Sequence, residues 1–236
     1  MTRLLLVALP LVALTVIAVA SSGSAATAFA CNGIHSGTIN GNVTVPNGSL
    51  CSLDGATVIG QVTVQAGGGL VIIHGSNIYG AVTSTTGPAA DFHAANAFGQ
   101  SDYPSYNGSI WICGSTVRGQ VTVSNSLNQV TIGAPDSGYF MDQYNHCPGS
   151  NIGGVVTATG VQGGVEIANS SLGGNVTISN TNGCPNDEFG CNDGNSPPAA
   201  SVEVTGNTIS GKLTCSNSQY GADVHDNTVT GKTSCT

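Results

Sequence analysis

The sequence predicts an all-β fold, a parallel β-solenoid in which the chain winds into coils of about 20 residues. A glycine recurs along the chain: four of its intervals fit one such coil, and three are nearly twice as long. Alternating apolar residues follow each glycine, and the composition combines 34 glycines with only 5% aromatic and 7% charged residues. This mixture and its periodic valines favour a regular β-array with many turns. The anchor glycines are Gly41, Gly60, Gly80, Gly119, Gly154, Gly174, Gly211 and Gly231.

Each coil is expected to contain three short strands. The residues two and four after the anchor point inward, as Val62 and Val64 do, and the residue two before it, such as Val58, forms the third inward position. A second inward pair lies between them: Cys51 and Leu53, Val71 and Ile73, Ile110 and Ile112, Val165 and Ile167, Val202 and Val204. The three strands imply a triangular cross-section with aliphatic columns about 4.8 Å per rung. Each anchor glycine is expected at a corner with positive φ.

Residues 1–30 have the features of a secretory signal peptide. Arg3 precedes the apolar run from Leu4 to Ala20, and small residues lead to Ala28-Phe29-Ala30. The run is too short for a membrane-spanning helix. Residues 1–30 are therefore predicted to be a cleavable signal peptide, and residues 31–236 a single solenoid domain without membrane insertion.

The three long intervals are predicted to be loop insertions. They cover residues of about 85–108, 134–149 and 180–200. The interval between Gly80 and Gly119 could instead contain an extra degenerate coil. The aromatic composition of its insertion favours a loop.

All eight cysteines follow the predicted signal peptide, so disulfides are expected. Cys215 and Cys235 stand one repeat apart in the same inward position, and Cys31 and Cys51 have the same separation. Stacked coils would bring such pairs within disulfide distance. The four predicted bridges are Cys31 with Cys51, Cys113 with Cys147, Cys184 with Cys191, and Cys215 with Cys235.

The charge balance argues against two classes of partner. After signal removal only Arg118, Lys212 and Lys232 are basic, against twelve acidic residues. Nucleic acids and anionic membranes bind through clustered lysines and arginines, so neither is an expected partner.

The segments TINGNVTVPNG (38–48), TVIGQVTVQAG (57–67) and NTVTGKTSC (227–235) resemble secreted actinobacterial β-solenoid proteins of uncharacterised function. Their pattern is also similar to the polymer-forming repeat of bactofilins. The resemblance covers nearly all of the chain after the signal peptide, and it implies a single-stranded, right-handed β-helix. Bactofilins are cytoplasmic and lack disulfides, so end-to-end self-association stays an open alternative here.

Hydroxyl residues form the most regular predicted surface. Three residues after the anchors stand Thr44, Thr63, Thr83, Thr122, Thr157, Thr177, Thr214 and Ser234, and five after them Thr85, Ser124, Thr159, Ser179, Ser216 and Thr236. The double column resembles the ice-binding surfaces of β-solenoid antifreeze proteins. The alternative is that threonine serves here as a soluble, β-branched strand residue.

Two groups of residues are candidate metal ligands. His35, Asp54 and His74 each stand six residues before an anchor, so three consecutive coils could place them at one corner around a transition metal. The alternative is an exposed column of turn residues. Asp187, Glu188, Asp193 and Asn195 offer oxygen ligands for calcium in the loop from Cys184, but without EF-hand spacing. Otherwise no cofactor is expected.

The resulting functional hypothesis is a secreted, non-enzymatic structural or surface-binding solenoid at the cell surface or cell wall. Tyr103, Tyr106, Tyr139 and Tyr144 lie in the insertions and could stack on extracellular polysaccharide. A polysaccharide-active enzyme is the alternative from another class. It requires neighbouring carboxylates on one face, and none is expected among the outward positions of adjacent coils. An ice-binding protein is the second alternative.

Overall fold

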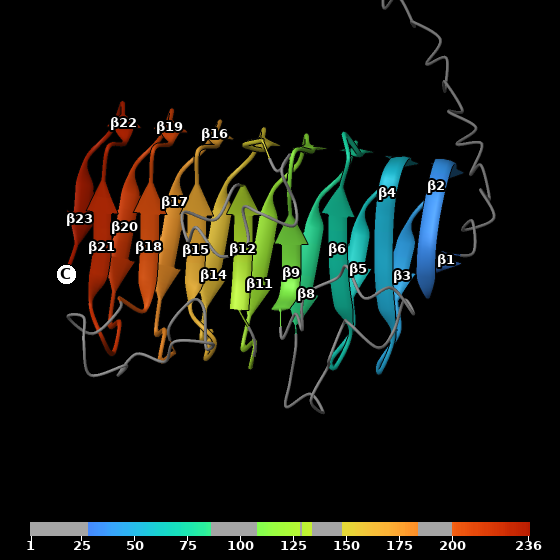
Figure 1. Ribbon diagram of the computed structural model, residues 1–236, viewed down its shortest axis with the longest axis horizontal. Coiled ribbons are helices and arrows are strands. Elements are labelled where there is room, and N and C mark those ends of the chain that lie inside the picture. Colours follow the sequence, from blue (N-terminus) through green and yellow to red (C-terminus); the bar gives the residue numbers. More distant parts are fainter. Residues whose placement is uncertain (1–27, 86–107, 128, 134–147, 184–199) are drawn as a thin grey trace, which may run out of the picture.

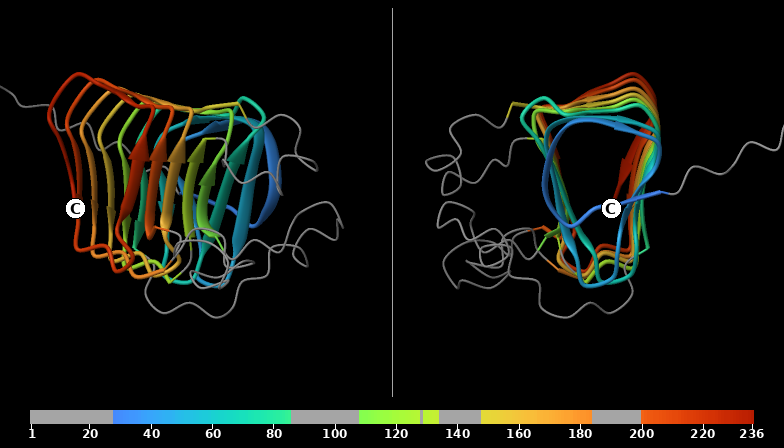
Figure 2. Two further views of the ribbon diagram at one scale, coloured as in Figure 1. Left: turned by 60° about the vertical axis from the view of Figure 1, so that its left-hand side comes forward. Right: turned by 90° about the vertical axis from the view of Figure 1, so that its right-hand side faces the viewer.

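The computed structural model describes residues 28–85, 108–127, 129–133, 148–183 and 200–236, and within these ranges the regular elements are all β-strands. The strands stack along one axis, each pairing in parallel with the equivalent strand of the next coil (Figure 1). Viewed along that axis, the coils outline a triangle (Figure 2). The predicted parallel β-solenoid is confirmed.

One side of the triangle, face one, is a nine-stranded sheet. Eight of its nine strands follow an anchor glycine, and in most of these an apolar residue alternates with threonine, which suits a half-buried strand. In order the nine strands are β1 (Phe29–Ala30), β3 (Val43–Val45), β5 (Val62–Val64), β8 (Val82–Thr85), β11 (Val121–Ser124), β14 (Val156–Thr159), β17 (Val176–Ser179), β20 (Leu213–Ser216) and β23 (Thr233–Cys235). The remaining strand, β1, precedes the first anchor glycine.

The other two sides belong to a fourteen-stranded sheet that bends at a corner. Both β2 (Gly33–Asn40) and β4 (Leu50–Ile59) contribute to each of these sides. Face two continues with β6 (Gly69–Ile73), β9 (Gly108–Ile112), β12 (Gln129–Gly133), β15 (Val165–Ala168), β18 (Val202–Thr205) and β21 (Ala222–His225). Face three continues with β7 (Asn77–Ile78), β10 (Thr116–Val117), β13 (Asn151–Ile152), β16 (Ser171–Leu172), β19 (Thr208–Ile209) and β22 (Thr228–Val229).

Strand pairing decides whether the interval between Gly80 and Gly119 contains an extra coil. β8 pairs directly with β11, β6 with β9, and β7 with β10. The interval is therefore a single coil with an insertion. All three insertions fall largely on residues 86–107, 134–147 and 184–199, outside the described residues.

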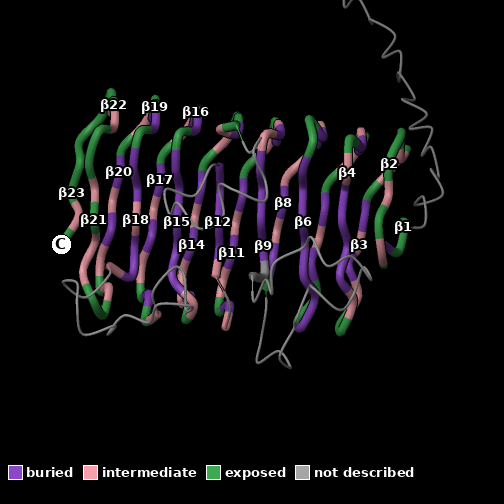
Figure 3. Tube along the Cα trace, viewed as in Figure 1, coloured by how far each residue is buried: buried purple, intermediate pink, exposed green. Residues whose placement is uncertain are grey.

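The aliphatic core runs the length of the solenoid, and the central coils are the most buried (Figure 3). The predicted inward positions are confirmed in all but one coil. In β6 the inward residues are Leu70 and Ile72, paired with Cys51 and Leu53, rather than Val71 and Ile73. The shift arises because this coil carries one more residue at the corner after β6, where His74 and Gly75 both have positive φ.

The anchor glycines are required for a different reason from the one the sequence suggested. Only Gly41 among them has a positive φ, of 123°. The others stack backbone on backbone: a Cβ on Gly119 would lie 2.6 Å from the carbonyl oxygen of Gly80. Positive φ occurs instead at corners that follow the strands, for example at Asn180 and Asn217.

The two predicted terminal disulfides are confirmed. Cys31 and Cys51 are joined with Cα atoms 5.4 Å apart, and Cys215 and Cys235 with Cα atoms 4.2 Å apart. Cys113 is also disulfide-bonded. Its predicted partner Cys147 and the predicted pair Cys184 and Cys191 lie outside the described residues.

One core position of face one carries a polar side chain, and removing its hydroxyl should stabilise the fold. Ser84 lies in register between Val64 and Val123, and its buried Oγ has no hydrogen-bond partner. We expect Ser84→Ala to raise the free energy of unfolding by about 1 kcal/mol, because a buried hydroxyl is desolvated without compensation. Chemical denaturation would measure this, with the exposed Thr85→Ala as control. A destabilised Ser84→Ala protein would contradict the prediction.

Candidate functional site

The outer surface of face one presents a continuous column of hydroxyl residues in strict register. Each member pairs with its equivalents in the neighbouring coils, as Thr122 does with Thr83 and Thr157. We call this column the threonine ladder: Thr44, Thr63, Thr83, Thr122, Thr157, Thr177, Thr214 and Ser234. Parallel pairing repeats its side chains about every 4.8 Å.

A second column runs beside the threonine ladder from the third coil onward. It consists of Thr85, Ser124, Thr159, Ser179 and Ser216 in register. Some of its hydroxyls bond to protein: Thr159 Oγ1 lies 3.1 Å from Ser179 Oγ. In the first two coils Pro46 and Gln65 take the equivalent positions, so the double array is confined to the later coils.

The threonine ladder is partly accessible to solvent along its length. The seven threonines are half-buried and Ser234 is exposed. Their flanking inward residues, such as Val121 and Val123 around Thr122, are buried and hold the strands rigidly. The described structure shows no side-chain hydrogen bond for these threonines, so their hydroxyl groups can bond to a partner or to water. The two columns contain no charged residue; Lys212 and Lys232 lie beside them.

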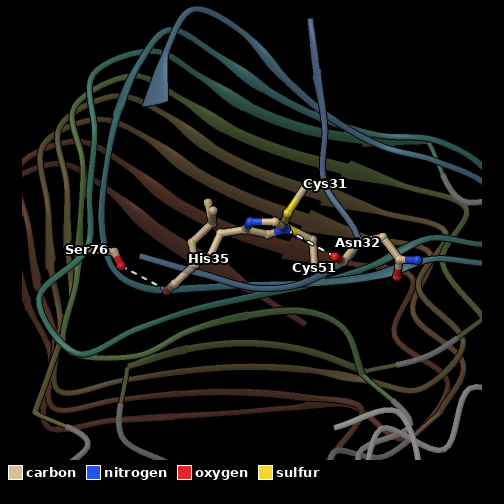
Figure 4. The surroundings of a disulfide bond; sticks show 6 residues. Cys31, Asn32, His35, Cys51 and Ser76 are labelled. Atoms are coloured by element: carbon tan, nitrogen blue, oxygen red, sulfur yellow. Dashed lines mark hydrogen bonds between the residues drawn. A yellow bond between two sulfur atoms is a disulfide. The ribbon is translucent and has the colours of Figure 1, made fainter. Parts of the chain in front are cut away.

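The structure brings together two of the three predicted metal ligands. His74 Nδ1 and Asp54 Oδ1 lie 2.7 Å apart at the corner after face two. His35 pairs instead with Leu53, and its Nε2 lies 3.0 Å from the carbonyl oxygen of Asn32 (Figure 4). The described residues contain no group of three histidine, cysteine or acidic side chains placed to hold a metal.

His74 and Asp54 are not equivalent positions, which explains why the predicted column does not form. Asp54 pairs with Ile73, so His74 stands one residue further, at the corner that Gly55 occupies in the coil before. His74 has a φ of 54°, and Gly55 one of 60°. The extra residue after β6 therefore turns a strand position into a corner position.

The other sequence-derived candidates lie outside the described residues. These are the aromatic residues Tyr103, Tyr106, Tyr139 and Tyr144, and the calcium candidates Asp187, Glu188, Asp193 and Asn195.

Face two contradicts the expectation that no carboxylates occupy neighbouring outward positions. Glu166 pairs with Glu203, and Glu203 pairs with Asp223, on three successive coils. We call these three residues the acidic column. The sequence pattern could have revealed these outward acidic residues, since each of them stands between two inward residues of its strand.

A buried polar corner between faces two and three was also not predicted. From the third coil onward, the residue four positions before an anchor has a short polar side chain, which in most of these coils accepts a hydrogen bond from a backbone N–H of the adjacent coil. These residues stack on one another from coil to coil. Ser170 Oγ, for example, donates to Ala168 O at 2.8 Å and accepts from Ser150 N at 3.0 Å. We call this set the corner ladder: Ser76, Ser115, Ser150, Ser170, Asn207 and Asn227.

Comparison with protein-family models, with curated proteins and with solved structures finds no match to this chain. No helix among the described residues is long and apolar enough to span a membrane. Any function assigned to the candidate sites therefore has to be argued from their geometry.

Proposed function

We propose that this protein is a secreted, non-enzymatic solenoid whose threonine ladder binds a regularly repeating surface, ice being the surface that best suits the array. The supporting observation is the strict register of eight hydroxyl residues, seven of them threonines without side-chain hydrogen bonds in the described structure. Each threonine offers one methyl and one hydroxyl group, and the array carries no charge. Such a surface can order water by contact and by hydrogen bonding at once.

Rigidity supports the same function. The ladder side chains lie on strands anchored by a buried core, so little conformational entropy is lost when they bind. Individual contacts can be weak because all of them form together along one sheet in register. Secretion is supported by the N-terminal segment, and the two terminal disulfides are compatible with an oxidising compartment.

Thermal hysteresis of the purified protein tests this function. We expect measurable hysteresis in the native protein and its loss in Thr122→Lys combined with Thr157→Lys, because two lysines interrupt the array at its centre. Thr208→Lys is the matched control, an exposed threonine on face three. Circular dichroism would verify that all the proteins keep their fold.

Absence of hysteresis in the native protein would reject ice as the target. Binding to insoluble polysaccharides is the second assay with the same variants. Polysaccharide binding that the two lysines leave unchanged would exclude the threonine ladder as the binding surface.

A further inference from the structure

The first strand of face one consists of residues that the sequence pattern placed in the signal peptide. β1 is formed by Phe29 and Ala30, and it is the first strand of the nine-stranded sheet (Figure 1). Phe29 pairs in parallel with Val43, and Ala30 pairs with Thr44. A mature chain that began at Cys31 would lack this strand and would leave β3 as the edge of the sheet.

The side chain of Phe29 stands at the N-terminal end of the aliphatic core. Its register partner Val43 is an inward residue with 0% exposure. The Phe29 ring meets the ring of His35 edge to face, with centroids 4.9 Å apart, and its backbone N–H donates to Asn42 O at 2.8 Å. At the other end, the inward Cys235 of β23, the last described strand of the sheet, is only half-buried. β1 therefore contributes to covering the first end of the core.

Cleavage after Ala30 would place a charged α-amino group on a buried residue. Cys31 has 0% exposure, and its sulfur is bonded to that of Cys51. Its backbone N–H donates to Thr44 O at 2.8 Å, which continues the pairing of β1 with β3. An ammonium group at the edge of the core loses part of its hydration, which costs free energy. Phe29, by contrast, is 37% exposed at the end of the sheet.

The sequence provides a second suitable cleavage site directly before β1. A signal peptide is cleaved after a segment with small residues at the first and third positions before the bond. Ala26 and Ala28 occupy these positions for the bond between Ala28 and Phe29, as Ala28 and Ala30 do for the bond after Ala30. Both bonds meet the sequence requirement, so the strand pairing of β1 distinguishes them.

We propose that a signal peptidase hydrolyses the Ala28–Phe29 bond during export, so that the mature protein begins with β1. Water is the second reactant: Ala28 leaves with a free carboxyl group at the end of the signal peptide, and Phe29 gains a free α-amino group. The inference rests on the secretion that is part of the proposed function. It does not depend on what the threonine ladder binds.

N-terminal sequencing and intact-mass spectrometry of the protein recovered from the culture medium test the site. The full-length precursor is expressed in a secreting host, and we expect the exported chain to comprise residues 29–236. An exported chain that begins at Cys31, or at any residue other than Phe29, would overturn this inference and leave secretion supported. An unprocessed chain retained in the cell would reject secretion itself, and the cleavage with it.

Two precursor variants separate the alternative bonds. Ala26→Gln places a large side chain at the third position before the proposed bond, so chains beginning with Phe29 should be lost. Ala30→Gln is the matched control, because Ala30 follows the proposed bond and is an exposed residue in register with the outward Thr44. Its processing should be unchanged. Blocked processing in Ala30→Gln together with normal processing in Ala26→Gln would reject the proposed site.

The melting temperature of the exported protein gives a second, independent measurement. Phe29→Ala should lower it by roughly 2–4 °C, because the ring is lost from the end of the core. If Phe29 left with the signal peptide, the native and variant precursors would yield identical mature proteins. Equal melting temperatures would therefore overturn the proposal.

Discussion

Replacing Gly119 with alanine is expected to destabilise the solenoid by about 3 kcal/mol or more. The new Cβ would lie 2.6 Å from Gly80 O and 2.7 Å from Ala81 N. Both atoms belong to the backbone of the preceding coil, so no side-chain rotation can relieve the overlap. The following coil is equally close, because a Cβ on Gly154 would lie 2.8 Å from Gly119 O. The coils would have to separate at this corner and lose core contacts.

Equilibrium unfolding in guanidinium chloride would measure this effect. Gly48→Ala is the control, because Gly48 has a φ of 71° but nothing within 4 Å of the Cβ that alanine would add. Its expected cost is about 1 kcal/mol, the penalty for a left-handed alanine. A Gly119→Ala protein no less stable than Gly48→Ala would show that backbone stacking does not explain the anchor glycines.

The fold could be predicted because its determinants repeat. Cys215 and Cys235 stand one repeat apart at the same inward position, and the structure pairs them in register. The threonine ladder followed from the same counting, since Thr157 and Thr177 have the same separation and are paired. Insertions did not disturb the register, because β17 pairs with β20 across residues 184–199.

Residue spacing did not predict the side-chain orientation in β6 or the position of His74, because both depend on the path of the backbone at the corners between strands. One additional corner residue at His74 exchanged the inward and outward sets in β6, and it moved His74 away from the position of Asp54. Periodicity identified the anchor glycines but not the reason why glycine is required there. Close backbone stacking and positive φ both select glycine, and the sequence does not distinguish them. The corner ladder was overlooked because serine and asparagine are common throughout this chain, which hides a periodic subset.

The stacking of the acidic column could be predicted from the sequence only in part. Glu203 and Asp223 stand one repeat apart, so their stacking was predictable from the spacing that aligned the cysteines. Glu166 precedes the insertion at residues 184–199 and Glu203 follows it, which concealed that pair. The burial of Glu166 and of the Thr131 hydroxyl could not be predicted, because the sequence pattern marks both positions as outward and does not tell which outward positions are buried.

Replacing Asn207 with leucine is expected to destabilise the protein by about 3 kcal/mol, because it removes the most connected member of the corner ladder. Asn207 is buried, and its Nδ2 donates to Ile167 O at 2.7 Å and to Thr205 O at 3.0 Å. Its Oδ1 accepts from Ser170 N at 2.8 Å. Leucine has a similar volume but would leave these buried backbone groups without their partners.

Asn207→Ser separates lost hydrogen bonding from altered packing. Serine already occupies this position in the preceding coil, where Ser170 Oγ both accepts from a backbone N–H and donates to a carbonyl. The smaller residue should therefore retain part of the network and cost about 1 kcal/mol, despite filling less of the corner. Denaturation of both variants would compare them directly. If Asn207→Ser is as unstable as Asn207→Leu, then side-chain volume, rather than the capping of backbone groups between coils, determines the stability of this corner.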